Sequence, residues 1–271
     1  MALESRTLYQ SPLVTVSDVQ CSEGCGDGRH EEHCPVATIA LVRSGSFVRR
    51  DRLGRHVADA TRVVFFDPSE PYMVDHPAPG GDRCTSLSFP VATLREAVRH
   101  ARGEPERLFS RTTLAGSAEL HLTHRELLLA AKMKDAVMVE ETALRLLQLC
   151  TAGEREPRPR GATATRAAEL AADAQVIIAG NYAGKLTLED IAADLHVSPF
   201  RLCRAFRQAT GGSLHQHVTR LRLAAALEKL PEYRERLTDL ALDIGFSSHS
   251  HFTHAFHGYF GRTPSAWLRS N

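Results

Sequence analysis

Residues 186–213 read LTLEDIAADLHVSPFRLCRAFRQATGGS, and residues 237–269 read LTDLALDIGFSSHSHFTHAFHGYFGRTPSAWLR. Each stretch begins with a short amphipathic helix, passes through a sharp turn and continues into a second helix with a polar outer face. This pattern is typical of a helix-turn-helix unit, whose second helix lies against base edges and phosphates. Two such units in tandem predict contacts with two successive turns of DNA.

In the first unit, apolar residues three and four apart within 188–195 predict a core-facing helix that Thr187 caps. Ser198 followed by proline predicts the start of the second helix, on which Leu202 and Phe206 point inward. Arg204 is placed best for a bidentate contact with guanine, and the other arginines suit phosphates; a solvated basic face is the alternative. The outward residues, predicted to contact DNA, are Phe200, Arg201, Cys203, Arg204 and Arg207.

The second unit follows the same plan. Its supporting helix presents Leu240 and Ile244 to the core, and Gly245 permits the turn. Four phenylalanines between residues 246 and 260 are predicted core anchors, and Pro264 begins a terminal helix that buries a tryptophan and a leucine. The outward residues, again predicted to contact DNA, are Ser248, His249, Ser250, His251, His254 and His257.

From about Thr163 to Arg269 the chain resembles the DNA-binding domain of the AraC/XylS family of transcription regulators. The matching elements are LCRAFR in the first unit, the connecting helix HQHVTRLRLAAALEKL at 215–230, and IGFSSHSHFTHAFHGYFGRTPSAWLR at 244–269. The resemblance implies an all-α domain with two helix-turn-helix motifs that binds double-stranded promoter DNA. It also implies a homodimer, with RNA polymerase as a further partner.

This chain departs from the family's pattern on the last recognition helix. Relatives often place arginine and lysine where this sequence has His254 and His257, and histidine is only partly charged near neutral pH. The hypothesis is that DNA affinity through this unit rises as pH falls through the histidine range. The alternative is neutral histidines that bond bases or face water.

Composition is that of an ordinary soluble protein rather than a disordered or fibrous one. The 271 residues are 43% hydrophobic and 24% charged, with a formal net charge of +1, so DNA binding is predicted from motifs and not from bulk charge. The first residues show no signal-peptide pattern, and no apolar run approaches membrane-spanning length. These features favour a cytoplasmic location.

The N-terminal part has a β pattern followed by a helical one. Short strands are predicted in VATIALV, SFVRR, ATRVVFF, PYMV and CTSLSF, separated by turn signals, and their spacing favours a small barrel. Helical periodicity then runs from Val91 to Cys150, and the seam formed by Val137, Leu144 and Leu147, with Met133, favours a dimer contact or packing on the barrel itself.

These patterns predict an α+β chain with three parts. Residues 1–150 form a sensor and dimerisation domain, residues 151–162 a linker rich in proline, glycine and charge, and residues 163–271 the DNA-binding domain. Strands before helices, ahead of such a DNA-binding domain, resemble the cupin-like effector domain of arabinose-regulator-like proteins. The His-x-His pair with a following glutamate of enzymatic cupins is not visible in the strand region.

The stretch CSEGCGDGRHEEHC at 21–34 concentrates thiols and imidazoles, ligands that suit Zn²⁺. The turn HPAPGGDRC at 76–84 adds His76, Asp82 and Cys84, and a barrel can bring it near the N-terminal cysteines. The zinc ligands predicted first are Cys21, Cys25, Cys34 and Cys84, with His33 and His76 as substitutes.

Several roles of this N-terminal domain stay open. A closed zinc site with four ligands would be structural. An exchangeable site would instead sense a metal, thiol oxidation or an electrophile. The third interpretation is that the cysteines are reduced thiols that bind no metal. An organic effector in an apolar barrel interior, with zinc purely structural, is an alternative signal. A metal-cupin enzyme fused to a DNA-binding domain is a further alternative, but no base, nucleophile and orienting set is visible, so no enzyme is predicted.

Overall fold

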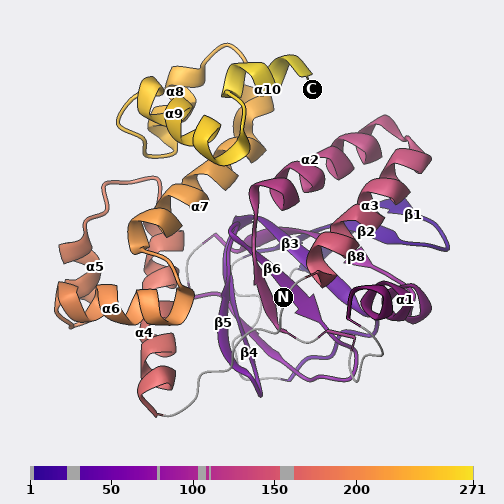
Figure 1. Cartoon of the computed structure of the whole chain (residues 1–271), viewed down its shortest axis with the longest axis horizontal. Helices are drawn as coiled ribbons and strands as arrows, with labels where there is room; N and C mark the ends of the chain where they lie inside the picture. Colours follow the sequence, from indigo (N-terminus) through magenta and orange to yellow (C-terminus); the bar gives the residue numbers. More distant parts are fainter. Residues whose placement is uncertain are drawn as a thin grey trace. The chain divides into compact units, whose positions relative to one another are not determined.

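The computed structural model describes residues 3–22, 31–77, 80–102, 108–109, 111–152 and 162–270. The chain divides into two compact units, Met1–Pro157 and Arg158–Asn271, which are described separately below (Figure 1). Most of the predicted linker lies outside the described residues. No helix in the described part of the chain combines the length and the apolar character needed to cross a membrane.

The N-terminal unit contains two antiparallel sheets (Figure 1). The strands predicted around 38–45, 47–51, 62–66, 73–75 and 82–88 are confirmed, whereas the other four strands were not predicted. The six-stranded sheet has the order β1 (Leu3–Gln10), β2 (Thr15–Cys21), β8 (Asp82–Ser88), β3 (Thr38–Gly45), β6 (Arg62–Phe66) and β9 (Thr113–Ala115), and the three-stranded sheet has the order β5 (Gly54–Ala58), β4 (Phe47–Asp51) and β7 (Met73–Asp75).

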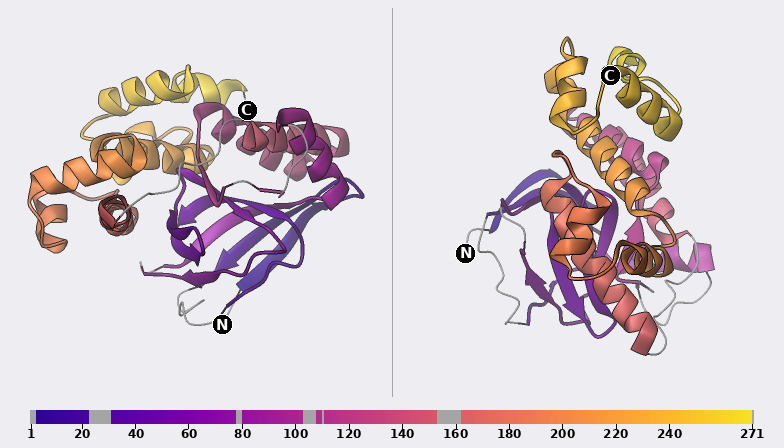
Figure 2. Two further views of the ribbon diagram at one scale, coloured as in Figure 1. Left: turned by 60° about the horizontal axis from the view of Figure 1, so that its bottom comes forward. Right: turned by 90° about the vertical axis from the view of Figure 1, so that its left-hand side faces the viewer.

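Each face of the six-stranded sheet has its own core. Because side chains alternate along a strand, Ile39 and Leu87 point to one face and Val42 and Cys84 to the other. The first face is covered by α1 (Val91–Arg102), α2 (Ala118–Met133) and α3 (Ala136–Thr151), as Figure 2 shows. The second face packs against Phe47 and its neighbours in the smaller sheet.

Local capping sets the bounds of the two longest helices of this unit. The Ser117 side chain accepts a hydrogen bond from the Leu120 amide at the start of α2, and Asp135 does the same for Met138 at the start of α3. Lys134, with φ of 58°, forms the left-handed turn between them. The three predicted helices are confirmed, but the strand β9 interrupts the segment that was predicted to be helical.

Two expectations for this unit are corrected. Leu147 is buried in the unit's own core and Leu144 packs against that core, so the predicted dimer seam is not an exposed stripe; Met133 and Val137 are 73% and 75% exposed. In the described part of the chain the strands form two separate sheets rather than one closed barrel, so the cupin-like barrel is not confirmed.

The C-terminal unit contains helices and no strand in its described residues, in agreement with the predicted all-α domain. Its two helix-turn-helix pairs are α5 with α6 and α8 with α9, and α7 runs between them (Figure 1). The helices are α4 (Ala162–Asn181), α5 (Leu188–Asp194), α6 (Pro199–Thr210), α7 (Leu214–Lys229), the 3₁₀ turn η1 (Leu230–Tyr233), α8 (Leu237–Asp243), α9 (His249–Phe260) and α10 (Pro264–Ser270).

Candidate nucleic-acid interface and metal-ligating residues

The two recognition helices, α6 and α9, are built alike. Each has twelve residues, and each begins at a serine whose side chain accepts an amide hydrogen bond, from Arg201 to Ser198 and from His251 to Ser248. Each ends at a glycine with φ of 74°. The two helices therefore correspond residue by residue from cap to cap.

This correspondence places equivalent side chains in the core. Leu202 of α6 matches Phe252 of α9, and Phe206 matches Phe256; all four are buried as predicted. Ring contacts continue the core of the second unit, since the Phe252 and Phe256 ring centroids lie 5.6 Å apart. Both recognition helices are thus held by bulky side chains four residues apart, which leaves the opposite face to solvent.

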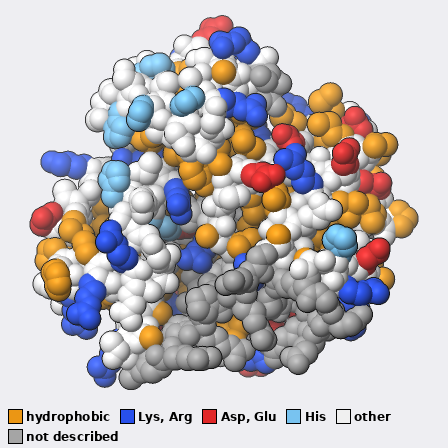
Figure 3. All heavy atoms as spheres, viewed as in Figure 1, with side chains coloured by type: hydrophobic (Ala, Val, Ile, Leu, Met, Phe, Trp, Pro, Cys, Tyr) orange, Lys and Arg blue, Asp and Glu red, His pale blue; other side chains and the backbone are white. Residues whose placement is uncertain are grey.

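On the outer face, three arginines of α6 correspond to three histidines of α9. Arg201 matches His251, Arg204 matches His254, and Arg207 matches His257, and all six are exposed. Figure 3 shows lysine and arginine side chains gathered over the α5–α6 region and histidines over the α8–α9 region. The two units thus present similar shapes with different side-chain chemistry, guanidinium groups on α6 and imidazoles on α9.

The other predicted contact residues lie on the same faces. Phe200 is 77% exposed. His249 is half-buried, and its Nε2 lies 3.4 Å from the Thr253 hydroxyl. The His251 ring meets Phe246 edge-on at 5.1 Å, and its Nδ1 lies 3.1 Å from the Ser247 hydroxyl. The remaining exposed residues of the predicted set are Cys203, Ser248 and Ser250.

The turns before the recognition helices use left-handed backbone in both units. His196 has φ of 53° in the first turn, and Gly245 has φ of 89° in the second. A Cβ on Gly245 would lie 2.8 Å from the Ala183 carbonyl oxygen and 2.9 Å from the Arg222 guanidinium. Arg222 in turn donates to the Tyr182 carbonyl oxygen at 2.7 Å. Sequence analysis did not single out this arginine, which links α7 to the segment after α4 beside the second turn.

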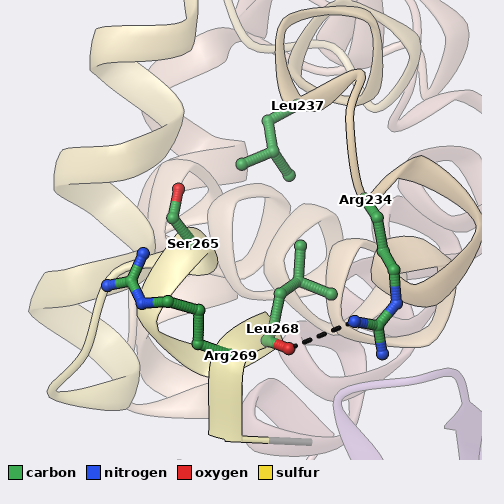
Figure 4. A pocket seen from close by; sticks show the side chains of 5 residues that line it. All are labelled: Arg234, Leu237, Ser265, Leu268 and Arg269. Carbon is green, nitrogen blue, oxygen red and sulfur yellow. Dashed lines mark hydrogen bonds between the residues drawn. The ribbon is translucent and has the colours of Figure 1, made fainter.

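A pocket in this unit lies apart from the outer faces of α6 and α9. It is lined by Arg234, Leu237, Ser265, Leu268 and Arg269 (Figure 4). The Arg234 side chain donates to the Leu268 carbonyl oxygen at 3.3 Å, which ties α10 to the segment before α8. We assign this pocket to the packing of the terminal helix.

The predicted zinc ligands are only partly brought together. In the described part of the chain, the one group of three or more candidate ligand side chains is Cys21, His76 and Asp82. Cys84 lies beside it with its thiol 3.0 Å from Asp82 Oδ2, and burial raises the pKa of this thiol well above its usual range.

The other predicted ligands lie elsewhere. The Cys34 thiol donates to the Val36 carbonyl oxygen at 3.0 Å and lies 3.5 Å from the Thr38 hydroxyl, and the neighbouring His33 is exposed. Neither residue belongs to the group around Asp82. Cys25 lies outside the described residues. The four-cysteine set is therefore not assembled by the described residues.

Comparison with known proteins bears on the C-terminal unit. A family model described as a helix-turn-helix domain matches residues 191–270. The transcriptional activator AarP of Providencia stuartii is 32% identical over 96 residues, which cover 35% of this chain and 71% of AarP. The chain belongs to the AraC family of transcription regulators. As an AraC-family regulator it binds double-stranded DNA, and the predicted class is confirmed.

Other similarities cover the same part of the chain. The Msm operon regulatory protein of Streptococcus mutans is 29% identical over 93 residues, and the match spans 34% of each protein, about a third of that relative's length. The solved structure of an AraC-type transcriptional regulator from Chromobacterium violaceum is 27% identical, with a TM-score of 0.34, covering 39% of this chain and 92% of that one.

Proposed function

We propose that this AraC-family regulator binds two successive major-groove segments of promoter DNA, one through α6 and one through α9. The equal length and matching caps of these helices support the proposal, because equivalent helices present equivalent outer faces. Their inner faces are fixed by buried side chains, so the outer side chains project from rigid elements.

The proposed roles follow from side-chain chemistry. Arg204 and its counterpart His254 stand in the middle of each exposed face, where contact with base edges is expected. Arg201 and Arg207 neutralise phosphates, as does His257 when it is protonated. The exposed ring of Phe200 suits apolar contact with a thymine methyl group.

The first test compares Arg204→Ala with Arg145→Ala on an operator selected from random DNA by the wild-type protein. Arg145 is an exposed arginine of the N-terminal unit, ion-paired with Glu119, and serves as the matched control. Arg204→Ala is expected to weaken binding by about 1–3 kcal/mol and to relax the preference at one base position. Equal effects of the two substitutions would contradict the assigned role.

For the N-terminal unit we propose reception of the signal that controls DNA binding, through its buried cysteines Cys21 and Cys84. The support is a separate fold with its own core and with thiols inside it. An organic effector is the second candidate. Operator affinity measured with and without a chelator under reducing conditions tests control through a metal bound by these thiols. This form of control predicts a change in affinity, and an unchanged affinity refutes it.

We also propose that the regulator is a homodimer. The exposed Met133 and Val137 at the α2–α3 turn support an apolar contact between copies. Sedimentation of the wild-type protein and of a Met133→Lys/Val137→Lys variant is the test. The proposal predicts a dimer that the double substitution weakens, and a wild-type monomer at micromolar concentration contradicts it.

A further inference from the structure

Cys21, His76 and Asp82 come together at one edge of the N-terminal unit, although 61 residues separate the first from the last. Cys21 ends β2 and Asp82 begins β8, and these two residues are direct partners in the antiparallel pairing. Direct partners point to the same face of a sheet. His76 follows β7, and one ligand atom from each of the three residues lies within 4.8 Å of the others.

All three side chains are removed from solvent. The exposed fractions are 6% for Cys21, 7% for the Asp82 side chain and 4% for the His76 side chain. His76 Nε2 lies 2.6 Å from Asp82 Oδ1. Burying a carboxylate costs free energy unless a cation or strong hydrogen bonds compensate it, and here the compensating partners are His76 and the Cys84 thiol.

Two glycines beside the three side chains, Gly81 and Gly45, stand where the backbone packs too closely for a Cβ. Gly81 has φ of 64°, and a Cβ there would lie 1.9 Å from the Cys21 carbonyl oxygen. Gly45 has φ of 71°, and its Cβ would lie 2.0 Å from the Gly81 carbonyl oxygen. The turn before β8 is therefore pressed against the ends of β2 and β3, which holds Asp82 beside Cys21.

Further groups orient the Asp82 carboxylate and the His76 imidazole from outside. The Cys84 thiol donates to Asp82 Oδ2 at 3.0 Å, leaving Oδ1 to face His76. The Phe47 ring centroid lies 6.2 Å from that of His76. Metal-binding carboxylates and imidazoles are commonly held by such outer contacts, which gives Cys84 a positioning role rather than a ligand's role.

We propose that Cys21, His76 and Asp82 are the protein ligands of a Zn²⁺ site, with a fourth position open to water or another donor. Thiolate, imidazole and carboxylate together suit zinc, whereas Mg²⁺ and Ca²⁺ prefer sites made only of oxygen and Cu⁺ prefers soft ligands alone. The inference deepens the thiol-dependent control proposed above and rests on that proposal only for its regulatory consequence.

Zinc fits this group after a small movement. Tetrahedral coordination with bonds of about 2.0 Å places a nitrogen and an oxygen ligand about 3.3 Å apart. The present separation of His76 Nε2 and Asp82 Oδ1 is 2.6 Å, so the hydrogen bond between them is exchanged for two metal bonds.

The experiment measures zinc per chain in the full-length protein, purified under reducing conditions, and then follows the absorption of the Co²⁺-substituted protein. About one zinc per chain and a thiolate-to-cobalt charge-transfer band are expected for wild type and for the control variant Cys34→Ser. In Cys21→Ser the band disappears. In Asp82→Asn it persists, and zinc affinity falls at least tenfold.

The asparagine of Asp82→Asn has the same size as aspartate and keeps hydrogen-bonding atoms toward His76 and Cys84. This variant therefore tests the site even if Cys21→Ser does not fold. Wild-type protein without stoichiometric zinc overturns the site, and so does an equal loss of zinc in Cys34→Ser and Cys21→Ser. Operator affinity of the same samples tests the proposed control separately, because zinc content alone decides the ligand set.

Discussion

The charge of the histidines on α9 should change the salt dependence of DNA binding by an amount that can be calculated. Each phosphate that a protein cation neutralises adds about 0.9 to the slope of log affinity against log salt concentration. If His257 contacts a phosphate when protonated, acidic buffer steepens this slope by about 0.9. Between about 50 and about 200 mM salt, a fourfold change, affinity then falls ~3.5-fold further at mildly acidic than at mildly basic pH.

Fluorescence anisotropy with the selected operator, at two pH values and two salt concentrations, measures this difference. His257→Gln is expected to remove it, leaving one slope at both pH values. The matched control is Arg207→Gln on α6, which changes the equivalent position and lowers the slope by about 0.9 at both pH values. Equal slopes for the wild type in acidic and basic buffer refute the assignment of phosphate contacts to α9.

Three further predictions concern stability, measured by urea unfolding. Burial lowers the pKa of His124 to about 3, so between this pH and about pH 6.5 the unfolded state binds a proton that the folded state does not. The free energy of unfolding should therefore fall by about 1.4 kcal/mol for each pH unit below about pH 6.5. His124→Gln should remove this dependence. A hydrogen bond from Arg83 lowers the pKa of Asp18, so the ionised Asp18 stabilises the folded state above the ordinary carboxyl range, and this stabilisation is lost as pH falls. Asp18→Asn should lower the free energy of unfolding by about 1 kcal/mol at neutral pH and by little in acid. An equal loss at both pH values would contradict the role of the ionised carboxylate. Gly245→Ala should cost about 1–3 kcal/mol because of its positive φ and close neighbours, whereas His196→Gly in the equivalent turn should stay within about 1 kcal/mol of wild type; a neutral Gly245→Ala would refute the argument.

The helix-turn-helix units were predictable because their signals are local. A serine cap, proline at the first helical position and apolar residues four apart all lie within one helix, as at Ser198, Pro199 and Leu202. The correspondence of arginines and histidines was equally readable, since it needs only the alignment of Ser198 with Ser248. Contacts from distant segments, such as Arg222 beside Gly245, carry no local signal.

The N-terminal sheets were harder to predict because burial there does not follow polarity. In β2, Asp18 lies on the buried face and accepts hydrogen bonds from Arg43 and Arg83, so the expected alternation of apolar and polar residues is broken. β1 is mostly exposed and pairs only with β2 among the described strands. Whether strands close into a barrel depends on pairings between distant segments, which periodicity does not specify.

Sequence analysis grouped Cys21 with Cys25, Cys34 and Cys84, with His33 and His76 as substitutes. In the described residues the side chains that lie beside Cys21 are those of His76 and Asp82, and the pairing of β2 with β8 brings Asp82 there. A shift of that pairing by one residue would move Cys21 to the opposite face from Asp82 and Cys84. Strand register therefore decides which side chains lie together at this edge, where Gly81 packs directly against the Cys21 backbone.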